Sequence, residues 1–139
     1  MIRWALFLPV ASHQFHCNYS SPLWEAGIEF GLENRIIPGY NCSLVPTAAM
    51  VSSGGKVDPP LVSLSYPYTH GGDAKDIILS ALAYWDPKFT YYSECSDGLG
   101  CAERQDPEKW SGNFSCVFHI RPSTYPQHYR WRCRFGNNA

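Results

Sequence analysis

The spacing of apolar residues predicts a helix in SPLWEAGIEFGLEN, residues 21–34. Trp24, Ile28 and Leu32 recur every four residues and form one apolar face, beside a row of glutamates. The segment opens with Ser-Pro, where serine can cap the helix and proline suits its first position. Its two glycines each weaken a helix by about 1 kcal/mol relative to alanine, unless another backbone packs closely against them.

A second helix is predicted over DAKDIILSALAYW, residues 73–85. Asp73 can cap it, and Asp76 lies in its first turn, where a negative charge is favourable. The Asp-Pro pair that follows ends the helix. Its apolar face consists of Ile77, Ile78, Ala81, Leu82 and Trp85.

Further segments have the alternation or the aromatic and β-branched content typical of β-strands. They are residues 40–45, 61–66, 88–93, 114–120 and 128–135. Two polar stretches, 52–60 and 94–113, are expected to be loops, the second closed by a bond between Cys95 and Cys101. The last two strands are expected to pair as a hairpin. The predicted fold is α+β: an antiparallel sheet of four to five strands with two helices packed on it, stabilised by disulfides.

The segment HYRWRCRF, residues 128–135, has the most regular alternation. As a strand it would place three arginines on one face, about 6.6–7 Å apart, close to the phosphate spacing of a nucleic-acid strand. Three interpretations stay open: a solvent-facing strand protected from aggregation by charge, a surface for a protein partner, and a nucleic-acid surface. Aromatic candidates for stacking are Trp110, Tyr125 and Tyr129. The candidate binding residues are Arg121, His128, Arg130, Arg132 and Arg134.

The length of 139 residues suits one domain, and 45% apolar residues argue against intrinsic disorder. Charge is unevenly distributed, because all twelve acidic residues lie at or before Glu108. The last 31 residues carry a formal charge of +5 and the first 108 carry −6. This asymmetry indicates either an anionic partner or internal neutralisation of the basic strand by the acidic helices.

Six cysteines in a small chain indicate disulfides and therefore an oxidising compartment. Their spacing does not match a zinc site, and no metal or cofactor is expected. Six cysteines allow 15 pairings, among which the sequence does not choose. The cysteines are Cys17, Cys42, Cys95, Cys101, Cys116 and Cys133.

Two further features agree with secretion. Asn18, Asn41 and Asn113 each begin an Asn-x-Ser glycosylation pattern. The N-terminal MIRWALFLPVAS resembles a shortened secretory signal peptide, with a first β-strand of the mature fold as the alternative. We expect a signal-peptide remnant over residues 1–12 and a single disulfide-stabilised domain over residues 13–139. No apolar run is long enough to span a membrane.

Residues suited to acid–base chemistry occur in a notable order. A carboxylate and a histidine on neighbouring strands can act as base and acid when an RNA 2′-hydroxyl attacks a phosphate, which an arginine can hold. The residues that fit this order are Tyr68, His70, Glu94, Arg104 and His119. Five histidines and twelve acids also produce such an order by chance.

The triplet Phe15-His16-Cys17, directly after the short secretory segment, resembles small secreted effectors of plant-pathogenic fungi. In the ribonuclease-like group of these effectors the first cysteine pairs with one near the C-terminus, which implies a bond between Cys17 and Cys133. That group is similar in fold to secreted guanyl-specific ribonucleases. The resemblance therefore implies a ribonuclease site formed by the five residues just named.

A second resemblance rests on Trp131-Arg132-Cys133-Arg134, which is similar to the Trp-Arg-apolar-Arg signature of an avirulence group from Leptosphaeria and related fungi. It implies a disulfide-linked sheet backed by helices and recognition by plant immune receptors.

The function expected from the sequence is a secreted, virulence-type effector that binds a host target and is not an enzyme. The expected partner is a host protein or immune receptor, with RNA as a further candidate and no membrane partner. We expect a monomer located outside the producing cell, with translocation into host cells left open. The alternative is a secreted guanyl-type ribonuclease or an inactive RNA-binding relative.

Overall fold

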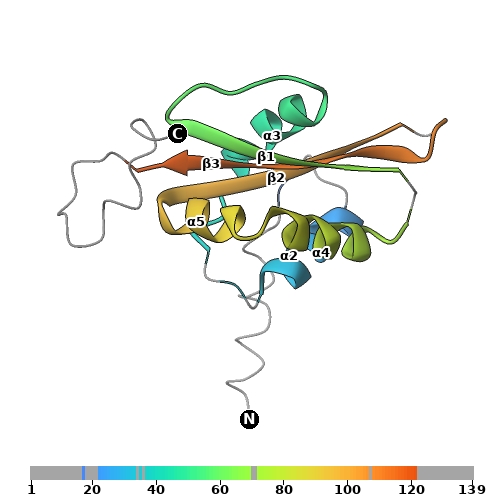
Figure 1. Cartoon of the computed structure of the whole chain (residues 1–139), viewed down its shortest axis with the longest axis horizontal. Helices are drawn as coiled ribbons and strands as arrows, with labels where there is room; N and C mark the ends of the chain where they lie inside the picture. Colours follow the sequence, from blue (N-terminus) through green and yellow to red (C-terminus); the bar gives the residue numbers. More distant parts are fainter. Residues whose placement is uncertain are drawn as a thin grey trace, which may run out of the picture.

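Three antiparallel strands form the sheet in the described part of the chain, and the helices pack around it (Figure 1). The computed structural model describes residues 17, 22–33, 35, 37–69, 72–106 and 108–121. The elements in chain order are α2 (Pro22–Leu32), the 3-10 helix η2 (Cys42–Leu44), α3 (Val45–Ser52), β1 (Leu61–Tyr68), α4 (Ala74–Trp85), α5 (Lys88–Glu94), β2 (Ser96–Asp106) and β3 (Ser111–Ile120).

The strand order is β1-β3-β2, so β3 is central and forms a hairpin with β2. Both outer strands are partly shielded from further pairing. On β2, Leu99 exchanges backbone hydrogen bonds with residues 39–41, at 2.7 and 3.1 Å. On β1, the Ser65 carbonyl accepts from Trp85 Nε1 at 3.0 Å, and Pro67 has no N–H to donate. These features limit edge-to-edge association of the sheet.

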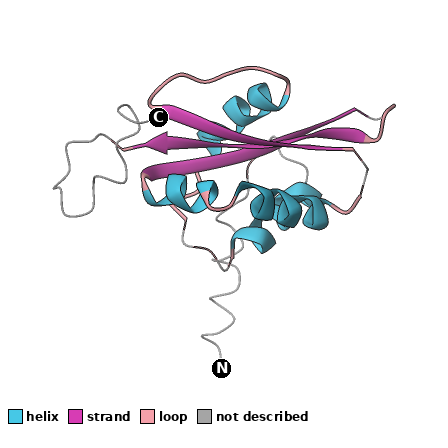
Figure 2. Ribbon diagram, viewed as in Figure 1, coloured by secondary structure: helices cyan, strands magenta, loops and turns pink. Residues whose placement is uncertain are grey.

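Helices cover both faces of the sheet, with α2, α4 and α5 on one face and α3 on the other (Figures 1 and 2). The larger core lies under α2, α4 and α5, where Trp24 stacks with both Tyr68 and Phe114 at centroid distances of 6.3 and 5.6 Å. A smaller core lies under α3 and joins Ala48 to Val117. Alternation along β3 supplies one row of side chains to each core.

The two glycines of α2 face α4. A Cβ at Gly27 would lie 2.8 Å from Ile78 Cδ1, and one at Gly31 would lie 2.9 Å from Ile78 Cγ2. The close packing that could justify glycines in a helix is therefore present. The helices predicted over 21–34 and 73–85 are confirmed as α2 and α4.

The predicted count of four to five strands and two helices is wrong, because the described residues form three strands and four α-helices. Segment 88–93 is α5 and not a strand, since Phe89 and Ser93, one helical turn apart, are both buried. Segment 40–45 is η2 and the start of α3, where the Asn41 side chain accepts from the Ser43 N–H. The strands predicted over 61–66 and 114–120 are confirmed as β1 and β3.

The predicted loop 94–113 contains β2 and the start of β3. One of its glycines, Gly100, is explained by packing, because a Cβ there would lie 2.7 Å from Leu44 Cβ on the covering η2 helix. The hairpin of the described residues therefore pairs β2 with β3. The predicted strand 128–135 and residues 1–12 lie outside the described residues.

Two disulfides are described, Cys17–Cys42 and Cys101–Cys116. The expected bond between Cys95 and Cys101 is wrong, because Cys101 and Cys116 face each other across the β2–β3 ladder. The bond between Cys17 and Cys133, which the ribonuclease-like resemblance implied, is wrong as well. Cys17 is held beside η2, where its backbone N–H also donates to Glu25 Oε2 at 2.6 Å. Cys95 is disulfide-bonded too.

Candidate binding surface

The β2–β3 hairpin ends in a tight turn that extends beyond the helices at one end of the molecule (Figure 1). Asp106 builds this turn. Its carbonyl accepts from the Lys109 N–H and its Oδ1 from the Glu108 N–H, both at 3.1 Å. Ser111 pairs with Asp106 and begins the return strand. We call residues 104, 106 and 108–110 the hairpin tip.

Trp110 is the most unusual residue of the hairpin tip. Its φ is +54°, in the left-handed region that glycine and asparagine normally occupy. This conformation costs a residue with a side chain about 1 kcal/mol or more. The side chain is 72% exposed. It forms no hydrogen bond, ring-stacking or cation–π contact with another described residue. A large aromatic side chain is thus held in solvent at a cost to folding stability.

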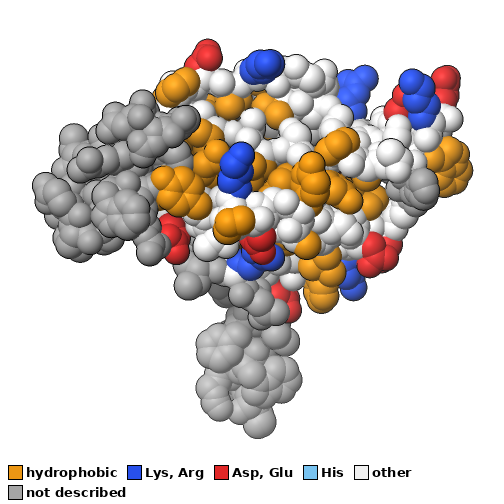
Figure 3. All heavy atoms as spheres, viewed as in Figure 1, with side chains coloured by type: hydrophobic (Ala, Val, Ile, Leu, Met, Phe, Trp, Pro, Cys, Tyr) orange, Lys and Arg blue, Asp and Glu red, His pale blue; other side chains and the backbone are white. Residues whose placement is uncertain are grey.

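The hairpin tip carries charges of both signs beside Trp110 in the sequence. Two are acidic and two basic: Asp106, Glu108, Arg104 and Lys109. None of them forms an ion pair with a described residue. At this end of the molecule, Figure 3 shows an apolar side chain beside basic and acidic ones. An exposed apolar group within a neutral polar rim is typical of a surface that binds protein.

The base of the hairpin is rigid. The Cys101–Cys116 disulfide joins the two strands, and both cysteines are 1% exposed. The Tyr40 hydroxyl accepts from the Cys101 N–H at 3.0 Å and donates to the Cys101 carbonyl at 3.2 Å. Burial raises the pKa of Tyr40 to about 12, so its hydroxyl keeps its proton and this clamp persists at all physiological pH values. A rigid support lowers the entropic cost of binding at the tip.

The described members of the expected ribonuclease set do not form one site. Tyr68 pairs with Gly112 at one end of β3, and His119 pairs with Leu61 at the other, about 20 Å away. Arg104 lies near Tyr68 along the sheet but on the α3 face, where it donates to Ser53 Oγ at 3.1 Å. Glu94 ends α5, where its carbonyl accepts from Arg121. His70 lies outside the described residues.

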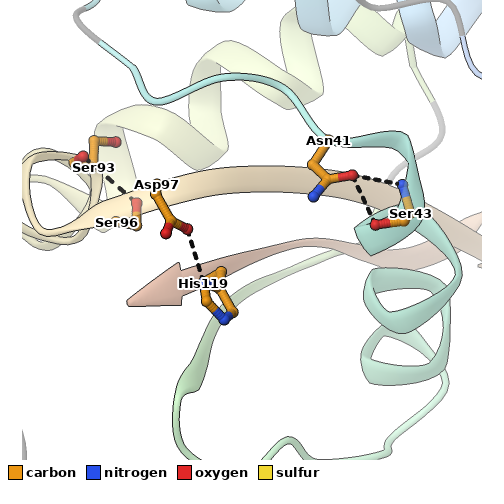
Figure 4. A network of polar contacts seen from close by, with 6 residues as sticks. All are labelled: Asn41, Ser43, Ser93, Ser96, Asp97 and His119. Carbon is orange, nitrogen blue, oxygen red and sulfur yellow. Dashed lines mark hydrogen bonds and ion pairs between the residues drawn. The ribbon is translucent and has the colours of Figure 1, made fainter. Parts of the chain in front are cut away.

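His119 has a different partner. Its Nδ1 lies 2.7 Å from Asp97 Oδ1, and both side chains are about half exposed (Figure 4). Nearby, Arg121 donates to the Glu94 carbonyl, and its own N–H donates to the Cys95 carbonyl at 2.9 Å. Arg121 is therefore occupied in joining β3 to α5. The other expected binding residues, His128, Arg130, Arg132 and Arg134, lie outside the described residues.

One polar cluster was not predicted from the sequence. The Tyr68 hydroxyl and Glu103 Oε1 are buried without a hydrogen-bond partner on the α2 side of the sheet. Burial raises the pKa of both groups, and the charge of Glu103 raises the pKa of Tyr68 further. Because both oxygens are sealed from solvent, the cluster is not an open ligand site. The sequence could reveal this cluster only as two polar residues at inward-facing strand positions, and those positions are known only once the strand register is known.

No group of three or more His, Cys, Asp or Glu side chains is suited to hold a metal ion in the described part of the chain. Among the described helices, none has the length and apolar character needed to cross a bilayer.

No protein-family model matches this chain, and no curated protein matches it. Among solved structures, the Ancylostoma-secreted protein Ac-ASP-7 is similar with 13% sequence identity and a TM-score of 0.48. The similarity covers 78% of this chain and 75% of that chain.

Proposed function

We propose that this chain is a secreted protein that acts by binding a target protein through the hairpin tip, and not by catalysis. The observation that carries the proposal is Trp110, which is 72% exposed at a backbone conformation unfavourable for tryptophan. Tryptophan is among the residues that dominate binding energy at protein interfaces. The strained conformation persists in a hairpin that is otherwise fixed by a disulfide and a tyrosine clamp.

A protein target suits the tip better than a nucleic acid. The rim has equal numbers of acidic and basic residues, whereas a nucleic-acid surface is strongly basic. The separation of Tyr68 from His119 along β3 also favours binding over ribonuclease activity. The disulfides support secretion, because such bonds persist in oxidising compartments. That the target belongs to a plant host depends on the resemblance to fungal effectors and stays a prediction.

The test selects ligands without assuming a particular host. A phage-displayed library of random peptides is panned on the immobilised, oxidised protein, and the affinity of enriched peptides is measured for variants. Trp110→Gly is expected to weaken binding by about 30-fold or more, equivalent to roughly 2 kcal/mol. Its Tm should equal or slightly exceed that of the wild type, because glycine accepts the left-handed backbone.

Tyr84→Ala is the matched control, since Tyr84 is 68% exposed but lies on α4, away from the tip. Peptide affinity for this variant should be unchanged. Peptides that bind Trp110→Gly as tightly as wild type, or a library that yields no enriched peptide, would contradict the proposal. Incubation of the wild type with RNA, beside Glu94→Ala and His119→Ala, tests the ribonuclease alternative. Cleavage that both variants lose would establish that alternative.

A further inference from the structure

We propose that Asn41 carries an N-linked oligosaccharide in the secreted protein, while Asn113, which has the same Asn-x-Ser pattern, stays unmodified. The inference rests on the secretory route of the proposed function but not on the hairpin tip. The sequence alone treats the two asparagines alike. The structure separates them by exposure, by local backbone conformation and by the partners of their serines.

Asn41 is exposed in a turn that precedes η2, and its own sequence pattern forms the turn (Figure 4). Its Oδ1 accepts from the Ser43 N–H at 2.9 Å and from the Ser43 hydroxyl at 2.7 Å. The Nδ2 atom makes no hydrogen bond to a described residue. The nitrogen is therefore available for reaction, and the hydroxyl required by the pattern already contacts the same amide group. Because all of these contacts span two residues, the turn can form before the rest of the fold.

Asn113 is the third residue of the central strand β3, paired with Pro67 on one side and Arg104 on the other. In an extended strand, side chains two residues apart are separated by about 6.6–7 Å, so the Ser115 hydroxyl is held away from the Asn113 amide. Ser115 is fully buried, and its hydroxyl lies 2.9 Å from Ser52 Oγ and 2.8 Å from Ser65 Oγ.

The Asn113 Nδ2 atom donates to the Ser52 carbonyl at 3.5 Å. The residue borders a hollow of about 670 Å³ beside β1 and the loop after α3. Open space beside the side chain therefore does not distinguish Asn113 from Asn41. The two differ in backbone conformation and in the Ser115 hydroxyl, which is already hydrogen-bonded.

The reaction is a glycosyl transfer from a lipid-linked oligosaccharyl diphosphate. A bond forms between the asparagine Nδ2 atom and C1 of the first sugar, and the bond from C1 to the phosphate oxygen breaks. The lipid diphosphate leaves with the bonding electrons, and one amide proton passes to a base of the transferase. The two hydrogen bonds to Asn41 Oδ1 favour this step, because they make the amide protons more acidic.

A glycan at Asn41 would leave the hairpin tip free. Asn41 lies beside Leu99 of β2, and the tip begins five residues further along that strand, about 17 Å away. The glycan would instead cover the outer edge of β2 near Gly98, whose missing side chain leaves room beside the Asn41 amide. This adds protection against edge-to-edge association where the bridge to residues 39–41 ends.

The test uses the full chain, expressed behind a heterologous secretion signal in eukaryotic cells. Peptide mass spectrometry after enzymatic deglycosylation in heavy-oxygen water reads the occupancy of each asparagine directly, and needs no variant. Asn41 is expected to be occupied in most molecules and Asn113 in few. Ser43→Ala should lose the mass of one glycan and Ser43→Thr should keep it, although both retain Asn41.

Two results would overturn the proposal: an unoccupied Asn41 in the secreted wild type, or equal occupancy of Asn41 and Asn113. Asn113→Gln is the matched control and should leave the glycan mass unchanged. A chain that fails to reach the medium counts against the proposed secretory route, whereas a secreted chain without sugar at Asn41 counts against this inference alone.

Discussion

Glu103 shows how a single inward-facing residue sets a pH dependence. Its buried Oε1 has no hydrogen-bond partner, and burial raises the pKa of its carboxyl group. A carboxyl group with a higher pKa in the folded state than in the unfolded state destabilises the fold when it is ionised. The destabilisation is therefore present at neutral pH and disappears as the pH falls through the raised pKa. Glu103→Gln removes the charge and keeps the shape of the side chain.

We expect Glu103→Gln to raise the Tm by about 2–4 °C at about pH 7, equivalent to roughly 0.5–1 kcal/mol. This gain should shrink toward zero at about pH 4, where the wild-type carboxyl group is protonated. Thermal unfolding followed by circular dichroism at both pH values measures the effect. Glu108→Gln, at an exposed position of the same hairpin, should leave the Tm unchanged. A gain that is equal at both pH values would show that ionisation of Glu103 does not destabilise the fold.

At the scale of elements, the contact between α2 and α4 gives a sharp prediction about two glycines. Gly27→Ala would stabilise an isolated helix by about 1 kcal/mol. Here the new Cβ would lie 2.8 Å from Ile78 Cδ1, so we expect a loss of about 1–2 kcal/mol in the free energy of unfolding. Ile78→Val removes Cδ1 and should relieve this clash. The loss in free energy of unfolding of the double variant should then be smaller than the sum of the two single losses by about 0.5 kcal/mol or more.

Gly31 supplies the matched control for this cycle. A Cβ at Gly31 would meet Ile78 Cγ2 at 2.9 Å, and valine retains that atom. Ile78→Val should therefore fail to rescue Gly31→Ala. Urea unfolding of the single and double variants measures both couplings. Equal rescue at the two glycines would mean that the helices separate as units instead of relieving individual contacts.

The elements also show what sequence patterns can and cannot predict. The periodicity of apolar residues and the residues typical of helix ends are sufficient to predict α2 and α4, because Trp24, Ile28 and Ile78 face one continuous core. They failed for α5, where aromatic residues that favour strands adopt a helix because Phe89 packs against Phe118 from a neighbouring strand, at 5.4 Å between ring centroids. They failed for β2 because its glycines resemble those of a loop. Gly100 is required by contact with Leu44, more than fifty residues earlier in the chain.

For the whole molecule, the candidate site was less predictable than the fold. The sequence marks Trp110 as an aromatic candidate, but its left-handed backbone depends on the Asp106 turn, and that turn depends on the pairing of β2 with β3. The ribonuclease set was inferred from residue order. Order along the chain does not fix which face of a sheet a residue occupies, and Tyr68 and Arg104 lie on opposite faces.

The two described disulfides should differ in how they affect the hairpin tip. Each closes a loop, with sequence separations of 25 for Cys17–Cys42 and 15 for Cys101–Cys116, and loops of this size stabilise by about 3 kcal/mol. Cys101–Cys116 joins the two strands that carry Trp110, whereas Cys17–Cys42 ties residue 17 to η2.

Replacing either pair with alanines should therefore lower the free energy of unfolding in urea by similar amounts. Only the loss of Cys101–Cys116 should weaken the affinity of Trp110-dependent peptides, measured well below the Tm of each variant. Equal loss of affinity in both variants would mean that binding depends on overall stability and not on the rigidity of the hairpin.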